Sequence, residues 1–457
     1  MHRLIGSKQF YKKVLYITIP IMIQNGITNF VNMLDNIMVG QVGTEQMSGV
    51  AIVNQLMFVF NICIFGAVAG AGILGAQYHG SGNHEGVRHA FRFKLFCCLG
   101  LCLFGILLFR EAGGSLIRTY LHEGGEVGDI EATFRYGCGY LDIMVAGLLP
   151  FAVVQVYSGT LRETGETVMP MVAGIAAVLV NMVFNYILIF GKFGAPVLGV
   201  HGAAIATVLS RFVELMIIVI WTHRHAEKNP FIRGVYRSLY IPRGTVRQIL
   251  ITGTPLLINE ALWSGGMATI AQCYSVRGLA VVAGINIANT IANVFNVVFL
   301  SLGTAVGIII GQLLGAGKLE EAKDEDNKLI AFAVFCCMAV GIVMFLIAPL
   351  FPQIYKTEEV VRRLATRFIQ ISALCMPLYG FTNAAYFTLR SGGKTMVTFL
   401  FDSVFVWLVS IPLVYVLTRY TGVPIVPVYL ACQLTEGIKC AIGFVLVRKG
   451  VWVQKVV

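Results

Sequence analysis

Apolar residues dominate twelve stretches of the chain, and short polar segments separate them. Runs such as VLYITIPIMIQNGITNFVNML and IAFAVFCCMAVGIVMFLIAPLF reach the roughly 20 residues that a helix needs to cross the hydrocarbon of a bilayer. We therefore predict an all-α polytopic membrane protein. The predicted spans cover residues 14–38, 48–77, 91–112, 134–160, 168–190, 199–222, 247–274, 281–312, 328–351, 365–389, 396–417 and 424–447.

The pattern repeats along the chain. An offset of 235 positions lays Pro20 to Arg88 over Pro255 to Lys323 without a gap, and it matches Asn54 with Asn289 and Gly80 with Gly315. Two later segments, LRETGET and LRSGGKT, match at an offset of 228. With six spans in each copy, the copies have the same orientation, so the repeat is parallel, about an axis along the membrane normal.

This duplication predicts three parts of the chain: an N-lobe over 1–222 with six transmembrane helices, a cytoplasmic linker over 223–247, and a C-lobe over 248–457 with six more. The linker holds six basic residues, and we expect it to lie along the lipid headgroups, partly as an amphipathic helix. Pro150 and Pro377 predict bends in the fourth and tenth spans, since proline removes a helical hydrogen bond.

Composition supports the membrane assignment. Of the 457 residues, 57% are hydrophobic and 12% charged, about half the charge of a soluble protein, which is roughly 25%. The mean hydropathy is +0.78. The chain has no Gly-rich phosphate loop ending in Gly-Lys-Ser/Thr, which excludes a fused ATPase. The first apolar stretch is too long for a cleaved signal peptide, so we expect it to be retained.

Charge predicts the orientation in a cell membrane, inner or plasma. With a cytoplasmic amino terminus, 22 of the 34 Lys and Arg residues fall inside and ten outside, so we expect both termini in the cytoplasm. The net charge of +11 then reflects this bias. Because basic patches interleaved with aromatic residues are missing, we expect no nucleic-acid partner.

Amide side chains form stripes within the predicted spans. The stripe residues are Asn25, Asn29 and Asn32 in the first span, Asn54 and Asn61 in the second, and Asn286, Asn289, Asn293 and Asn296 in the eighth. Spacings of three and four place the residues of the first and eighth spans on one helical face. Such residues either hold helices together by hydrogen bonds or line a water-filled cavity. Whole stripes favour the cavity, so we assign them to a substrate path.

Acidic residues within spans are the sharpest functional candidates, because a buried charge is costly in a membrane. Asp35 lies beside the first stripe, and a low dielectric favours its neutral form unless a cation compensates. Glu260 takes the place of Asn25 in the second copy. Either carboxyl could instead reach the interface or bond a neighbouring helix. Two further pairs, Arg211 with Glu214 and Glu436 with Lys439, are spaced i,i+3 and are expected to be structural.

The chain shows no constellation for catalysis. His79, His84 and His89 are spaced by five, which does not align ligands on a helix, and the eleven cysteines follow neither a disulfide nor a zinc pattern. An integral-membrane enzyme would require a cluster of His, Asp or Glu that is not seen. We therefore expect no enzyme and no bound cofactor, only a transported H⁺ or Na⁺.

Over essentially its full length the chain resembles the multidrug and toxic compound extrusion (MATE) transporters. The resemblance rests on IPIMIQNGITNFVNMLDNIMVGQVG, GILGAQYHGSGN, LRETGET, NMVFNYILIFGKFGAPVLGVHGAAIAT, GIIIGQLLGAGKLEEA and LRSGGKT in this order. It implies two pseudo-symmetric six-helix lobes around a V-shaped central cavity. It also implies export of cationic, amphipathic compounds in exchange for H⁺ or Na⁺ by alternating access.

The same resemblance assigns residues. Asp35 matches the acid of the first helix implicated in cation coupling, and Asn181 matches an Asn of an N-lobe ion site. Asn185 stands where those members carry Asp, which favours H⁺ over Na⁺ here. Glu260 resembles the seventh-helix acid of another branch.

We therefore expect a cation-coupled antiporter, monomeric in the lipid bilayer, that exports small molecules. The alternative is a flippase for lipid-linked precursors or polysaccharides from the same superfamily. Few cationic residues in the spans count against it.

Overall fold

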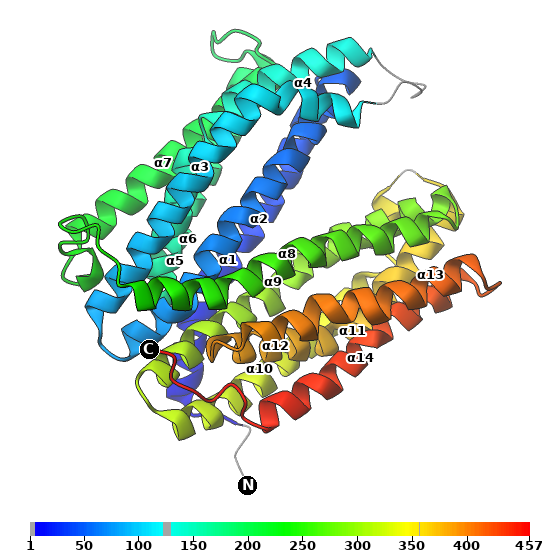
Figure 1. The fold of residues 1–457 in the computed structure, drawn as a ribbon. Helices are drawn as coiled ribbons and strands as arrows, with labels where there is room; N and C mark the ends of the chain where they lie inside the picture. The colour runs from blue at the N-terminus through cyan, green and yellow to red at the C-terminus, as the bar shows by residue number, and fades with distance from the viewer. Residues whose placement is uncertain (1–4, 122–128, 356) are drawn as a thin grey trace. The chain divides into compact units, whose positions relative to one another are not determined.

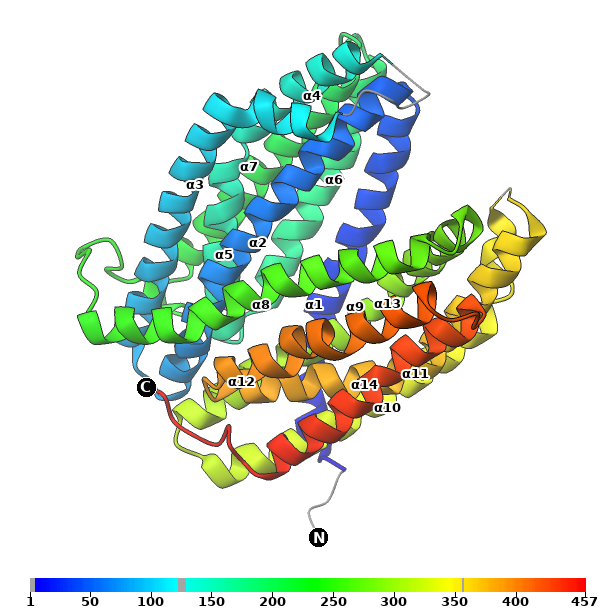
Figure 2. The same cartoon turned by 45° about the vertical axis from the view of Figure 1, so that its right-hand side comes forward.

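In the computed structural model, which describes residues 5–121, 129–355 and 357–457, the described residues form helices and connecting turns without a β-strand. The chain divides into two compact units. The amino-terminal unit consists of residues 23–75 and 84–248, and the carboxy-terminal unit consists of residues 1–22, 76–83 and 249–457. Each unit is a bundle of long helices (Figures 1 and 2).

The first half of the chain contains α1 (Lys8–Gly40), α2 (Thr44–Gly80), α3 (His84–Tyr120), α4 (Ile130–Val145), α5 (Leu148–Glu163), α6 (Val168–Phe190) and α7 (Val200–Arg224). The fourth predicted span is thus two helices, α4 and α5, which meet at an angle of 47°. The expected bend is confirmed here, with Pro150 in the first turn of α5, where its missing N–H costs no helical bond.

The second half begins with the 3₁₀ turn η1 (Pro230–Ile232), followed by α8 (Arg243–Ser275), α9 (Leu279–Gly315), α10 (Leu319–Ile347), the 3₁₀ turn η2 (Phe351–Ile354) and α11 (Glu359–Ser391). The next span combines α12 (Thr395–Phe399), the π-helical segments η3 (Leu400–Val404) and η4 (Val406–Ser410), and α13 (Ile411–Arg419). The last helix is α14 (Ile425–Arg448). At the other predicted bend, α11 continues through Pro377 as one helix with the proline in its interior.

The helices account for twelve spans. Among the described residues nine helices are long and apolar enough to cross a membrane, and the bent α4–α5 pair provides a tenth. The helices α8 and α11 are as long, with 33 residues each, but they carry more polar and charged side chains. The chain is therefore a multi-pass membrane protein, as predicted.

The carboxy-terminal unit includes the beginning of α1 because that segment has an apolar face. Phe10, Val14, Ile17 and Ile21 pack in one core with residues of α9, α10 and α11. The end of α2, residues 76–83, belongs to the same unit. Its Gln77 is fully buried, donates to the Ser391 carbonyl oxygen at 2.8 Å and accepts from the Val456 amide at 2.7 Å.

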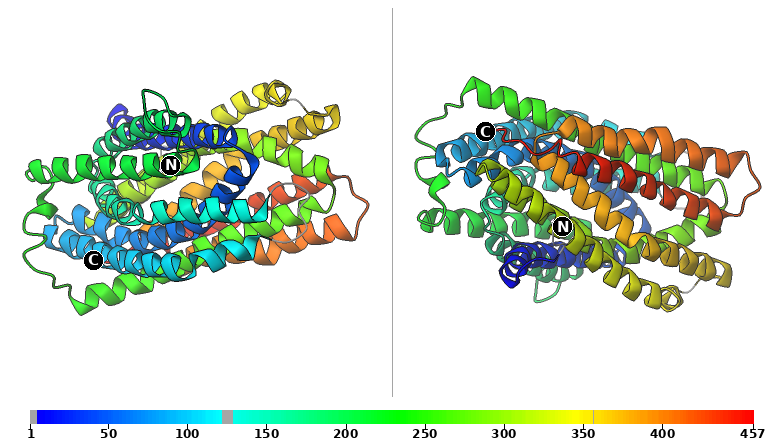
Figure 3. Two further views of the ribbon diagram at one scale, coloured as in Figure 1. Left: turned by 90° about the horizontal axis from the view of Figure 1, so that it is seen from above. Right: turned by 90° about the horizontal axis from the view of Figure 1, so that it is seen from below.

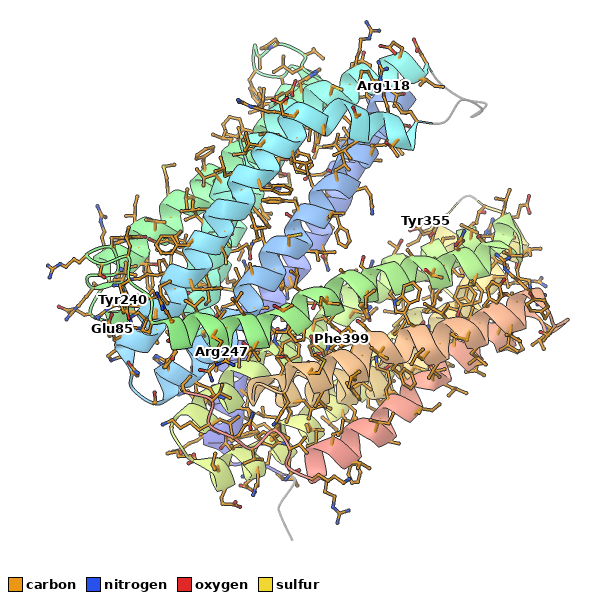
Figure 4. The ribbon with its side chains drawn as sticks, viewed as in Figure 1. Glu85, Arg118, Tyr240, Arg247, Tyr355 and Phe399 are labelled. Atoms are coloured by element: carbon orange, nitrogen blue, oxygen red, sulfur yellow. The ribbon has the colours of Figure 1, made fainter. Side chains whose placement is uncertain are left out.

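The linker differs from the amphipathic helix expected from its charge. Between Arg224 and Arg243 it forms turns and the three-residue η1. Arg92 of α3 donates to the carbonyl oxygens of Val235 at 2.7 Å and Tyr240 at 3.2 Å, so linker backbone groups are satisfied by a side chain rather than by a helix. Tyr240 and Glu85, which also contacts Arg92, are labelled in Figure 4. That prediction was wrong because tertiary contacts override the helical pattern.

Candidate functional site

Three side chains that the sequence singles out come together in the amino-terminal unit. Asp35 extends from α1, while Asn181 and Asn185 lie one turn apart on α6. The Asn185 amide nitrogen donates to Asp35 Oδ1 at 2.7 Å and to Asn181 Oδ1 at 3.1 Å. Asn185 is 1% exposed and Asn181 6%, whereas Asp35 is partly exposed. The acid is therefore held by buried amides and still reaches the surface of its unit.

The Asn181 amide also contacts Asp35, and its orientation decides how. One terminal atom lies 2.9 Å from Asp35 Oδ2, and the other lies 3.2 Å from Thr207 Oγ1. When Asp35 is ionised, the Asn181 atom beside Asp35 Oδ2 must be the amide nitrogen, because two acceptors repel. A protonated Asp35 requires the oxygen there, because the acid then donates. Thr207 of α7 was not singled out in the sequence; a polar residue one turn before Arg211 was its only signal.

One polar atom of this group has no partner. Asn185 Oδ1 is buried and accepts no hydrogen bond within the part of the chain that the structure describes. Buried polar atoms are nearly always paired, so an orphan acceptor beside a carboxyl indicates a site for a donor or a cation. We call Asp35, Asn181, Asn185 and Thr207 the Asp35 cluster.

A second ionisable group lies inside the carboxy-terminal unit. Lys439 of α14 is 6% exposed, and its Nζ lies 2.9 Å from Asp402 Oδ1 and 3.4 Å from Glu436 Oε1. The expected Glu436 contact is thus present, but the shorter one is to Asp402. Asn259 of α8 donates to Asp402 Oδ2 at 3.2 Å, which ties α8 to the π-helical segment η3. Such π-helical turns occur often at functional sites.

Glu260 belongs to this second group and not to the Asp35 cluster. It follows Asn259 on α8 of the carboxy-terminal unit, is partly exposed, and interacts electrostatically with Arg390 and Asp402. The structure therefore brings together three of the four predicted coupling residues, and the fourth lies in a separate ionisable network.

The other predicted pair, Arg211 and Glu214, interacts electrostatically. Arg211 also donates to the Gly147 carbonyl oxygen at 3.2 Å, and its guanidinium lies 5.0 Å from the centre of the Phe151 ring. This carbonyl lies between α4 and α5 and also accepts the backbone N–H of Phe151 at 3.2 Å. The i,i+3 spacing thus agrees with an electrostatic interaction, while the guanidinium makes its hydrogen bond to the Gly147 carbonyl oxygen.

The asparagine stripes lie on exposed faces of their helices. Asn29 and Asn54 in the amino-terminal unit, and Asn286, Asn289 and Asn293 in the carboxy-terminal unit, are exposed, while Asn25, Asn61 and Asn296 are partly exposed. The side chain of Asn32 lies outside the described residues. None of these eight described amides is in the core of its own unit.

Sequence reasoning missed one buried ion pair. Lys94 of α3 is fully buried, and its Nζ lies 2.6 Å from Glu163 Oε1 and 3.2 Å from Thr160 Oγ1. Gly72 and Gly75 of α2 pass directly over the carboxylate, where an added Cβ at Gly72 would lie 2.7 Å from Oε1. The basic residue had no acid within four positions, so no local signal identified the pair.

Comparison with known proteins gives the family assignment. The MatE family model matches residues 20–187 and again residues 255–416. The two matches begin at Pro20 and Pro255, the same positions at which the internal repeat aligns, so the repeat is a property of the family. No group of three or more His, Cys, Asp or Glu residues in the described ranges could hold a metal ion.

Similar proteins support this assignment over nearly the whole chain. A probable multidrug resistance protein NorM of Thermotoga maritima is 25% identical over 411 residues, which are 90% of this chain and 86% of the relative. The multidrug resistance protein MdtK of Edwardsiella ictaluri is 24% identical over 410 residues, which are 89% of this chain and 87% of the relative.

Among solved structures, an outward-facing multidrug resistance MATE family transporter of the MOP superfamily has a TM-score of 0.87 at 21% identity. The alignment covers 98% of this chain and 96% of that structure. It confirms the all-α fold of two six-helix lobes.

Proposed function

The chain belongs to the MatE family of membrane transporters, which are not enzymes, and from this premise we propose that it is a cation-coupled exporter of small molecules. The observation that carries the proposal is the Asp35 cluster, a single carboxyl held by amides within a span. A carboxyl in a membrane is costly unless its charge is neutralised, so binding of a cation and the state of the protein are coupled there.

The Asp35 cluster has two alternative hydrogen-bond patterns, and a proton switches between them. When Asp35 is ionised, the amides of Asn181 and Asn185 both donate to it. When Asp35 is protonated, it donates to Asn181 Oδ1, and the Asn181 nitrogen faces the Thr207 hydroxyl at 3.2 Å. Protonation therefore changes the bonds between α1, α6 and α7, which is what a coupling step requires.

The ligand set favours H⁺ over Na⁺. The cluster contains one carboxylate, since Asn185 stands where Asp would add a second negative charge. The Asn185 nitrogen, not its oxygen, faces Asp35, and a cation prefers oxygen ligands. A proton needs only the one carboxyl.

The exposed asparagines support a water-filled path for the substrate. Polar side chains of membrane spans avoid lipid and face protein or water. Asn29, Asn54, Asn286, Asn289 and Asn293 are exposed on their own units, so we propose that they line the cavity through which a cationic or amphipathic substrate passes. The names of the relatives, multidrug resistance proteins, support this class of substrate.

The orientation with both termini in the cytoplasm rests on the distribution of Lys and Arg. In this orientation an inward proton gradient can drive export. No observation favours the flippase alternative over an exporter.

Dye efflux from proteoliposomes tests the proposal. The full chain is reconstituted with a fluorescent cationic dye inside, and a pH gradient and a Na⁺ gradient are imposed separately. Dye release should follow the pH gradient. If dye release follows only the Na⁺ gradient, the coupling ion is Na⁺ and not H⁺. If release occurs with neither gradient, export is not coupled to a cation.

A further inference from the structure

A basic cavity lies at one end of the carboxy-terminal unit. It has a volume of about 370 Å³ and lies between η2 and the first turns of α11. Its wall includes Pro352, Arg362, Arg363, Arg367 and Gln370. Tyr355, labelled in Figure 4, follows η2 at this end, and the region between α10 and α11 can be followed in Figure 3.

The described lining residues carry excess positive charge. Three guanidinium groups face one carboxylate, that of Glu359, so the net charge is 3 − 1 = +2. Glu359 contacts Arg363 Nε at 3.0 Å and Arg362 Nη1 at 4.0 Å. Within the described ranges the Arg367 side chain makes one hydrogen bond, to Gln370 Oε1 at 3.5 Å. The Arg367 guanidinium therefore retains donors for a ligand.

The backbone fixes one of these arginines. Arg362 Nε and Nη2 donate to the Thr357 carbonyl oxygen at 3.1 and 2.8 Å, which turns its guanidinium toward the start of α11. That helix is 33 residues long and has no side-chain cap at its amino terminus. Its partial positive charge adds to that of the arginines.

The position of these arginines is unusual for a membrane protein. In the proposed orientation ten basic residues lie outside, where Lys and Arg are depleted, and three of them line this one cavity. Exposed apolar residues precede them: Leu346 is 67% exposed, Leu350 62% and Ile354 75%. Guanidinium groups next to exposed aliphatic residues match a headgroup joined to acyl chains.

We infer that this cavity binds the phosphate group of an anionic phospholipid. Arginine presents a planar fork that matches phosphate oxygens, and Arg363 and Arg367 are spaced i,i+4, so they lie on one helical face. Arg362 completes the cluster, while the acyl chains lie over Leu346, Leu350 and Ile354. Phosphatidylglycerol, with one negative charge and no cationic group, fits the net charge better than a zwitterionic lipid. The outside position of these arginines rests on the proposed orientation, but the lipid-binding readout is separate from transport.

Native mass spectrometry of the delipidated full-length protein tests this inference. Phosphatidylglycerol or phosphatidylcholine is added in equal amounts, and the bound fraction is measured. We expect the wild type to retain phosphatidylglycerol preferentially. The triple variant R362Q/R363Q/R367Q should lose this preference by about tenfold, as expected for the loss of charge-assisted bonds.

A matched control is R110Q/R118Q/R135Q, which removes three exposed arginines from the amino-terminal unit. This control should keep the lipid preference. Equal retention of both lipids by the wild type, or equal loss in the control, would overturn the site.

Inorganic phosphate distinguishes a phospholipid headgroup from a free phosphate compound as the source of the bound phosphate group. Phosphate at millimolar concentration should compete weakly with the lipid. If phosphate alone stabilises the wild type and phosphatidylglycerol does not, the lipid assignment is wrong and a free phosphate compound is the ligand. If the triple variant does not fold, R367Q alone gives the measurement, because the hydrogen bond of Arg367 to Gln370, at 3.5 Å, is the longest that the three arginines make.

Discussion

Gly80 lies against the backbone carbonyl of Gln312, and its counterpart in the second copy, Gly315, lies against that of Gln77. A Cβ added at either glycine would be 1.9 Å from the carbonyl oxygen it faces. These residues are equivalent under the 235-position offset, so the ends of α2 and α9 make one contact twice, with the roles exchanged. The repeat seen in the sequence is therefore a packing symmetry within the carboxy-terminal unit.

This contact predicts that Gly80→Ala destabilises the protein by about 1–3 kcal/mol, the usual cost of overpacking, because the obstacle is backbone and cannot rotate away. The melting temperature in detergent measures the effect. Gly100→Ala is the control, since a Cβ there meets nothing within 4 Å and alanine favours a helix. Equal melting temperatures for the two variants would show that the α2–α9 contact accommodates the added Cβ without loss of stability.

Asp35→Asn should abolish efflux driven by the pH gradient, by at least about tenfold, while leaving the fold intact. The amide is isosteric but cannot exchange a proton, so the two hydrogen-bond patterns of the Asp35 cluster no longer interconvert. Initial rates of dye efflux measure the loss, with the elution profile in detergent as the check on folding. A variant that retains full gradient-driven efflux would remove Asp35 from the coupling step.

Asn185→Asp should make efflux respond to Na⁺. The substitution places a second carboxylate beside Asp35, where Asn185 Nδ2 now lies 2.7 Å from Asp35 Oδ1, and two carboxylates offer charge and oxygen ligands to a cation. Efflux is measured under a Na⁺ gradient at fixed pH for wild type and variant. A Na⁺ response already present in the wild type would contradict the proton assignment.

Glu260→Gln should reduce efflux less than Asp35→Asn does. Glu260 has Arg390 as a cationic neighbour, so its charge is partly compensated within the carboxy-terminal unit. The two variants are compared in the same vesicles under the same pH gradient. A larger loss for Glu260→Gln would place the main coupling step in the carboxy-terminal unit instead.

Lys94→Met should destabilise the protein by about 3–5 kcal/mol, because it leaves the Glu163 carboxylate buried and uncompensated. The double variant K94M/E163L should recover much of this loss, since it removes both charges. Melting temperatures report both effects.

An exposed pair serves as the comparison. Lys323 Nζ lies 2.7 Å from Glu320 Oε1, and the two side chains are 44% and 86% exposed. Lys323→Met should therefore lower the free energy of unfolding by less than about 1 kcal/mol. If Lys94→Met cost no more than this control, the buried pair would contribute nothing to stability.

Local pattern predicted much of the fold. The span 168–190 agrees with α6 at both ends, because a long apolar run has one low-energy arrangement in a bilayer. The expectation that the linker is partly helical is wrong, because Arg92, which lies more than 100 residues earlier in the chain, donates to the backbone carbonyl oxygens of the linker.

The residues of the candidate site also divide into those that the sequence identifies and those that only the structure reveals. Asp35 could be singled out because a carboxyl in a span is conspicuous in any sequence. Thr207 and Asn259 could not, since each is an ordinary polar residue until a partner on another helix is known. Lys439 was assigned to Glu436, its neighbour on the helix, and its shorter contact to Asp402 on a different span stayed hidden.

The sequence by itself determined the number of spans, the duplication and the acidic residues within spans, because these depend on composition and on spacing along the chain. Tertiary structure alone decided which polar groups meet. Asp35 and Asn185 are 150 residues apart, yet they share a hydrogen bond of 2.7 Å. Packing of α1 against α6 creates that contact, and no periodicity within either helix encodes it.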